Sequence, residues 1–251
     1  MKTLPTTLNE VLDELNAIVE QSMAQNDCAG LFAYVYYRTT LQIKTAIEAG
    51  DFEDAKRMEE FDVVFTNLYL KAYYDYKSNQ PISQAWQIAF DADSKNLSVL
   101  QHVLLGMNAH INLDLGISAS QVMQGKNILD LESDFEKVNG ILASIVQELQ
   151  SRLARVSPLL FLLDWVGGHK DEKIINFSMV KARQYAWHLA KDLWRLKDEA
   201  HQSKIKSADL FVSKLAQNII KPPGVLIPIL LQLIKWFESQ NISKTIRRIK
   251  F

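Results

Sequence analysis

Hydrophobic residues recur every three or four positions along most of the chain, which is the spacing that lines one face of an α-helix. The first such stretch runs from Leu8 to Val19 and has acidic residues between its apolar positions. Glycine, proline and short polar turns separate it from the stretches that follow. This pattern predicts helices over approximately residues 8–19, 31–49, 51–77, 83–93, 97–115, 130–156, 158–166, 178–200, 207–220 and 225–240.

Two of the residues at helix ends carry specific expectations. Asp51 can cap the helix that begins beside it, and Gly116 is expected to end the helix that starts near Leu97. No stretch alternates between apolar and polar residues over a convincing strand length. Helices of this length joined by short turns predict an all-α fold, and we expect a single domain over residues 1–251, a bundle of roughly eight to ten helices.

Composition agrees with this fold and narrows the function. The 251 residues include one cysteine, 9 glycines and 6 prolines, which excludes an intrachain disulfide and disfavours a sandwich or barrel. Residues 1–125 carry 8 Lys and Arg against 16 Asp and Glu, and residues 126–251 carry 20 against 13, so an acidic first half precedes a basic second half. No basic block is dense enough to indicate nucleic-acid binding. The first residues lack the apolar core of a secretory signal, so we expect a cytoplasmic protein.

The densest polar anomaly lies in the very apolar stretch Leu100–Leu115. Four polar residues interrupt it, namely Asn108, His110, Asn112 and Asp114. Each buried polar group costs a few kcal/mol unless it finds a partner. His110 and Asp114 are four residues apart on one helical face, where they could share a divalent cation or hydrogen-bond each other. Asn108 and Asn112 lie on nearly the opposite face, and both pairs could instead simply join the helix to its neighbours.

A metal site would need a ligand from a second helix. Asp62 is the strongest candidate because apolar residues flank it on both sides. The predicted ligands of a divalent metal ion of unknown identity are therefore His110, Asp114 and Asp62. His102 could join only from the edge of that face. Gly106, one turn before His110, leaves room for a ligand or for a close helix contact.

Arg183 is the third residue with a predicted catalytic role, beside His110 and Asp114. Its guanidinium could form a bridge to a buried carboxylate such as Asp62 or Asp114, packed by Trp187, and we favour this interpretation. It could also hold an anionic substrate. Tyrosines crowd the first half of the chain and could line an amphipathic ligand pocket: Tyr34, Tyr36, Tyr37, Tyr69, Tyr73, Tyr74 and Tyr76.

The C-terminal end suggests a second kind of function. An apolar stretch, Val225–Phe237, precedes a basic tail in which Ile242, Ile246 and Ile249 share one helical face. Such a tail is typical of a helix that lies on an anionic membrane surface. The alternative is a last core helix followed by a solvated basic tail.

Several of these motifs resemble an uncharacterised, mostly bacterial family, domain of unknown function 5995. The stretch Gly106–Leu115 resembles the family's signature, Asp62–Tyr69 resembles its Asp-x-x-Phe-Ala-Asn-x-Tyr segment, and Ala182–Trp187 resembles its Ala-Arg-x-x-Ala-Trp helix. The resemblance covers most of residues 8–200 and implies an all-helical fold without an established reaction. It also implies that the family's motif set includes Asp62, Asn67, Asn108, His110, Asn112, Asp114 and Arg183.

Two functional hypotheses follow from these residues. The first is a metal-dependent, hydrolase-like enzyme that acts on a small or lipid-like substrate through His110 and Asp114. The second is a non-catalytic module that binds a ligand or a membrane surface, in which the buried polar residues form a structural network. Neither hypothesis identifies a substrate or an oligomeric state.

Overall fold

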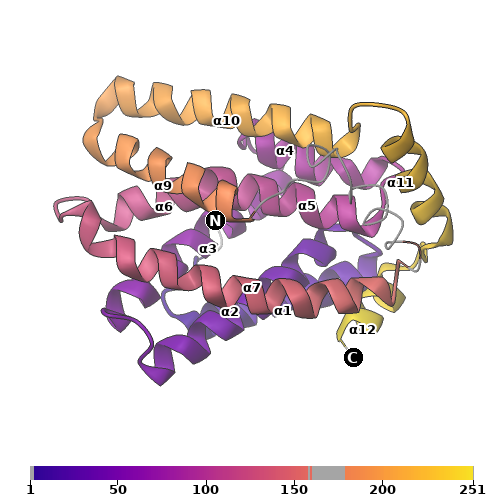
Figure 1. Ribbon diagram of the computed structural model, residues 1–251, viewed down its shortest axis with the longest axis horizontal. Helices are drawn as coiled ribbons and strands as arrows, with labels where there is room; N and C mark the ends of the chain where they lie inside the picture. The colour runs from indigo at the N-terminus through magenta and orange to yellow at the C-terminus, as the bar shows by residue number, and fades with distance from the viewer. Residues whose placement is uncertain (1–2, 158, 160–178, 251) are drawn as a thin grey trace.

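The computed structural model describes residues 3–157, 159 and 179–250, and over these residues the fold is all-α, as the periodicity predicts, with no strand. The helix predicted over 158–166 lies outside the described residues, apart from residue 159, which lies in a turn. Figure 1 shows the arrangement of the helices. Their bounds are α1 Leu8–Gln25, α2 Ala29–Ala49, α3 Ala55–Lys77, α4 Gln84–Phe90, α5 Val99–Ala109, α6 Leu115–Val122, α7 Glu132–Ala154, α9 Met179–Arg195, α10 Asp198–Ile220, α11 Leu226–Phe237 and α12 Ile242–Lys250.

Three short helical turns complete the described elements. They are the 3₁₀ turns η1 (Asp91–Ser94) and η3 (Ile128–Leu131) and the π-helical turn η2 (His110–Asp114). Because η2 joins α5 directly to α6, these three elements form one continuous helical rod. The rod crosses the interior and contacts α2, α3, α4, α9 and α10, so its buried residues occupy the centre of the bundle.

Local chemistry explains most helix ends. The Thr7 side chain accepts from the Glu10 amide at the start of α1, and Asn26 ends that helix with a left-handed φ of 57°. The expected cap at Asp51 is wrong, because α3 begins later and the Asp54 side chain accepts from the Arg57 amide over 2.9 Å. Capping residues satisfy amides that have no partner within the helix.

The prediction that Gly116 ends a helix is also wrong. A β-carbon at Gly116 would lie 2.8 Å from the Ala186 carbonyl oxygen, so glycine here permits the close approach of α9. A β-carbon at Gly106 would lie 2.3 Å from Phe32 Cγ, which shows the close helix contact that was one of its two expected roles. Both glycines therefore serve packing along the rod.

The C-terminal helices divide their apolar residues between the core and the surface. Ile242, Ile246 and Ile249 of α12 are buried, and the helix packs on α1, α2 and α7. Of the two alternatives for these isoleucines, the structure therefore has the core helix. One side of α11 is also buried, while its other side is exposed. Within the described residues no helix is long and apolar enough to cross a membrane.

Candidate functional site

His110 and Asp114 form a buried hydrogen-bonded pair in the π-helical turn. His110 Nδ1 lies 3.0 Å from Asp114 Oδ2, and the Trp86 indole Nε1 donates to the same oxygen over 2.9 Å. Because Trp86 donates to Oδ2, the simplest proton arrangement has the Nδ1–H group of His110 donating to it as well. That tautomer leaves His110 Nε2 as a bare acceptor. π-Helical turns inside α-helices occur frequently at functional sites.

Aromatic rings hold the His110 imidazole in place. The Phe65 ring stacks on it with a centroid distance of 3.7 Å and an interplanar angle of 7°. The Tyr36 ring meets it edge-on at 4.3 Å, and the Tyr36 hydroxyl is fixed by a 2.6 Å hydrogen bond to Thr66. Within the described residues, His110 Nε2 is buried and has no hydrogen-bond partner. An unpaired buried polar atom of this kind costs about 1–3 kcal/mol.

A cavity of about 80 Å³ adjoins this ring, and we call it the His110 cavity. Its polar lining includes Asp62, His110 and Arg183, three of the residues predicted from the sequence. Asp62 Oδ2 is a second buried oxygen without a partner among the described residues. Most of the wall is apolar and comes from α2, α3, the central rod, α7 and α9: Phe32, Val35, Tyr36, Ile43, Met58, Phe61, Phe65, Met107, Ile111, Leu115, Val138, Leu142 and Met179.

Burial controls the protonation of the three acid–base groups. It lowers the pKa of His110 well below the usual range, so the imidazole is neutral at pH 7. It raises the pKa of Asp114 well above its usual range, an effect that the Trp86 hydrogen bond opposes. It also raises the pKa of Asp62 to about 7. The cavity therefore holds a base with a free lone pair and a carboxyl group that titrates near neutrality.

Arg183 lies on α9 and points toward α7 rather than to a carboxylate. Its Nε donates to Asn139 Oδ1 over 2.6 Å, its Nη2 donates to the Phe135 carbonyl, and its guanidinium lies 4.2 Å from the centroid of the Phe135 ring. The predicted bridge from Arg183 to Asp62 or Asp114 is therefore wrong. Trp187 does not pack such a bridge either, since its Nε1 donates to Glu132 over 2.8 Å.

The Arg183 guanidinium is nonetheless charged at pH 7. Burial lowers the pKa of Arg183 to about 9, which is still two units above neutrality. In the described part of the chain no carboxylate lies within ion-pair distance of it. A buried cation whose partners are neutral retains an attraction for an anion.

Two of the three predicted metal ligands lie together. His110 and Asp114 are in contact, whereas Asp62 lines the same cavity as His110 from α3. Among residues 3–157, 159 and 179–250, no group of three or more His, Cys, Asp or Glu side chains is placed to hold a metal ion.

The remaining motif residues serve packing. Asn108 Nδ2 donates to the Val212 carbonyl of α10 over 3.0 Å, and Asn112 Nδ2 donates to Asn108 Oδ1 over 3.1 Å. Asn67 Nδ2 donates to the Pro5 carbonyl over 2.9 Å. The asparagine pair therefore joins the rod to α10, as the structural alternative expects.

His102 lies away from the His110 cavity. It lines a separate space of about 20 Å³ beside Cys28 and Asp93, and burial lowers its pKa to about 4. It does not join His110, and it provides a natural comparison for that residue because both are buried histidines of the same rod.

Sequence reasoning missed three contributors to the site: Trp86, Phe65 and Asn139. A signal existed only for Trp86, because a buried indole N–H needs an acceptor and Asp114 was one of the two carboxylates expected in the core. Ring stacking by Phe65 and the amide contact of Asn139 depend on how distant helices meet.

The fold and the cavity define an all-α protein with a buried His–Asp pair beside an apolar chamber. The model of a family of unknown function, DUF5995, matches residues 8–222, and the chain belongs to this family. The resemblance seen in the motifs is thereby confirmed. No curated protein and no solved structure matches the chain. The family match includes every residue of the site and ends before α11.

Proposed function

We propose that this protein is a hydrolase-like enzyme that performs acid–base chemistry on a small or lipid-like molecule in the His110 cavity. The observation that supports this most is the unpartnered Nε2 of His110 beside an apolar cavity, with Nδ1 held by Asp114. A fixed neutral imidazole with one free nitrogen is the arrangement of a general base. A polar group of a bound molecule would remove the cost of leaving Nε2 and Asp62 Oδ2 unpaired.

The residues around the cavity would have separate roles in the reaction. His110 would accept a proton at Nε2 from water or from a substrate hydroxyl and return it to the leaving oxygen. Asp114 would position the ring and stabilise the imidazolium, and Trp86 would hold Asp114. Arg183 would attract an anionic group of the substrate, and the apolar wall would bind its hydrocarbon part.

The volume of the cavity limits the substrate. A water molecule needs about 10–15 Å³ of this kind of volume, and an engineered cavity of about 150 Å³ accepts benzene. A cavity of about 80 Å³ therefore suits a group of a few non-hydrogen atoms. We infer a short-chain molecule, or the reactive end of a longer lipid-like one.

A divalent metal ion remains part of the hypothesis. His110 Nε2 is the ring nitrogen that would be available to it, and a metal would supply a polarised water. Elemental analysis of protein purified without a polyhistidine tag or chelator tests this, because bound metal near one ion per chain should be lost in His110→Gln. We also propose a cytoplasmic location, which fractionation of the source cells would test.

Turnover of p-nitrophenyl acetate, butyrate and octanoate tests the proposed enzyme. We expect His110→Gln to lower kcat/KM by about 10²–10⁴-fold, the usual contribution of a general base. His102→Gln is the matched control because it alters a buried histidine of the same rod outside the cavity, and it should retain activity. Thermal unfolding of both variants checks that they fold.

Two results would overturn the enzymatic proposal. Equal activity losses in the His110 and His102 variants would assign the loss to folding. Calorimetric binding of butyrate or octanoate without turnover of any ester would instead support the non-catalytic ligand-binding module.

A further inference from the structure

One side of α11 exposes a continuous apolar stripe. The indole of Trp236 is 82% exposed and Ile229 is 51% exposed, although the opposite side of the helix is buried in the protein. Large apolar side chains rarely gather on the surface of a soluble protein without a binding role. We call this stripe the α11 face; its members are Leu226, Ile229, Leu233, Trp236 and Phe237.

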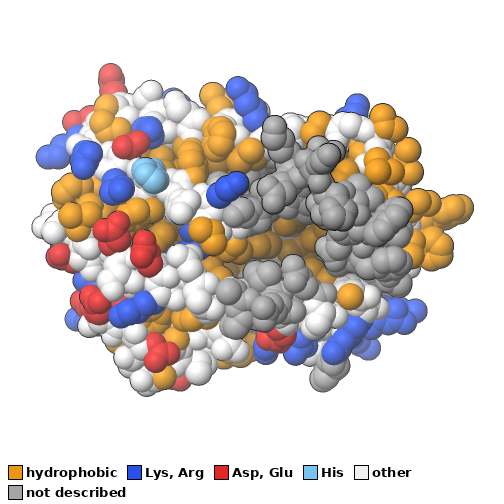
Figure 2. All heavy atoms as spheres, viewed as in Figure 1, with side chains coloured by type: hydrophobic (Ala, Val, Ile, Leu, Met, Phe, Trp, Pro, Cys, Tyr) orange, Lys and Arg blue, Asp and Glu red, His pale blue; other side chains and the backbone are white. Residues whose placement is uncertain are grey.

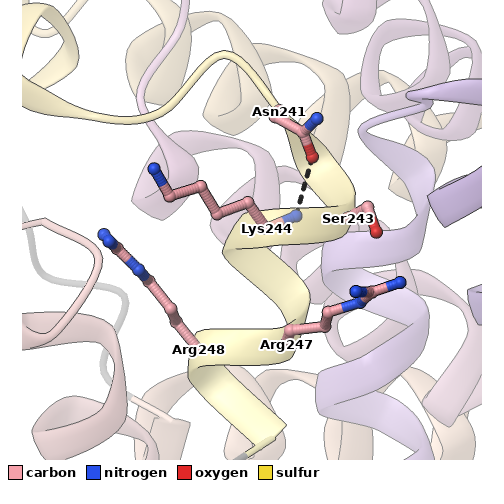
Figure 3. Close-up of a pocket in the computed structure, with 5 residues that line it drawn as sticks. All are labelled: Asn241, Ser243, Lys244, Arg247 and Arg248. Atoms are coloured by element: carbon pink, nitrogen blue, oxygen red, sulfur yellow. Dashed lines mark hydrogen bonds between the residues drawn. The ribbon is translucent and has the colours of Figure 1, made fainter.

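The next helix along the chain, α12, carries exposed cations. Lys244, Arg247 and Arg248 are exposed, and none of them forms an ion pair within the described residues. In Figure 3, Lys244 and Arg248 extend to the same side of α12, while Arg247 points to the other side. Figure 2 shows hydrophobic side chains projecting at the end of the molecule that carries α11, with Lys and Arg side chains beside them.

Neither α11 nor α12 contributes an exposed acidic residue, and the exposed Glu20 of α1 pairs with Lys250 at the end of α12. The only acidic residue between Leu226 and Lys250 is Glu238. It is buried, and its carboxylate accepts hydrogen bonds from the Val99 amide and the Ser157 hydroxyl. The combination of an exposed apolar stripe, an exposed tryptophan and unpaired cations matches the chemistry of a lipid interface.

We propose that the α11 face and the cations of α12 dock on an anionic phospholipid membrane. The 12 residues of α11 span about 18 Å, which is too short to cross a hydrocarbon core of about 30 Å, so the helix would lie in the interface. A second copy of this chain fits the surface less well, because a symmetric pair would bring unpaired cations of both copies together without acidic partners. This proposal does not depend on the function of the His110 cavity.

Flotation with vesicles tests the proposal on the full chain. The protein should bind vesicles of phosphatidylcholine with about 30% phosphatidylglycerol, and it should bind pure phosphatidylcholine vesicles at least about tenfold more weakly. Ile229→Ser combined with Trp236→Ser should lower binding at least about tenfold. Leu210→Ser combined with Phe211→Ser removes exposed apolar residues of α10 and should leave binding within about twofold.

A second pair of variants tests how much the cations of α12 contribute to membrane binding. Lys244→Glu with Arg248→Glu, the two cations on one side of α12, should abolish the preference for anionic vesicles, whereas Lys206→Glu with Lys214→Glu makes the same change in charge on exposed lysines of α10 and should retain it. Absence of vesicle binding, or equal losses in the α10 controls, would overturn the proposal. So would a dimer in sedimentation velocity that the α11 variant dissociates, since a second copy would then cover the stripe.

Discussion

Two polar pairs occupy nearly opposite faces of the same buried rod, and they differ in how completely they are satisfied. Asn108 and Asn112 bond to each other and to the Val212 carbonyl, and neither has a buried side-chain atom without a partner among the described residues. His110 and Asp114 bond to each other and to Trp86, yet His110 Nε2 stays unpartnered beside a cavity.

This difference separates a structural network from a candidate site. Spacing and burial are similar in the two pairs, so these two properties alone do not distinguish them. A network in which every buried polar atom has a hydrogen-bond partner stabilises the fold and has no free group left to bind a ligand. An incomplete one beside empty volume lowers stability, and that loss is offset when a ligand supplies the missing partner.

The largest expected effect on stability comes from Asp62, which lines the same cavity as His110. Burial raises the pKa of Asp62 to about 7 in the folded protein, whereas an unfolded chain has an aspartate pKa of about 3.9. The stability that this proton provides is fully present below about pH 4 and is lost as the pH rises through about 7. Asp62→Asn should therefore gain up to about 4 kcal/mol relative to wild type between these pH values.

Urea unfolding of wild type and Asp62→Asn across this pH range measures that gain. Glu59→Gln is a suitable control because it removes a carboxylate of the same helix. Parallel pH dependence in wild type and Asp62→Asn would show that Asp62 is not the titrating group of the cavity.

A smaller effect on stability should come from the fully hydrogen-bonded pair, Asn108 and Asn112. Asn108→Ala removes the side-chain bond from the rod to the Val212 carbonyl and leaves the Asn112 amide without its partner in the core, which should lower the free energy of unfolding by about 2–3 kcal/mol. His110→Gln should cost less, because it removes a group that is already incompletely bonded. Chemical denaturation of both variants at pH 7 makes the comparison. A greater loss in His110→Gln would reverse the assignment of the two pairs.

The sequence predicted the all-α fold because a half-buried helix must repeat its apolar residues every three or four positions. It also predicted Asp62, His110 and Arg183 as site residues, and in the structure all three line one cavity. The partner of Arg183 was not predictable, since a guanidinium can donate to a carboxylate or to neutral oxygens and only the tertiary arrangement decides between them.

Tertiary contacts also decide the roles of Gly116 and of the isoleucines in α12. Gly116 ends a helix in isolation but permits a close contact with α9 in the bundle. The isoleucines of α12 have the same periodicity whether they face a membrane or a core, so the sequence left both alternatives open, and in the structure they face the core. The π-helical turn leaves no mark in the sequence, because His110 and Asp114 are four residues apart in any helix.

The most direct test of the site is the protonation of His110, measured by ¹⁵N–¹H correlation spectra of histidine-labelled protein at pH 7. His110→Gln identifies its signals among those of the 5 histidines. We predict a neutral ring that carries its proton on Nδ1, leaves Nε2 bare and resists protonation on acidification well below pH 6.5. A proton on Nε2, or an imidazolium that titrates near pH 6.5, would contradict the assignment of His110 as a free general base.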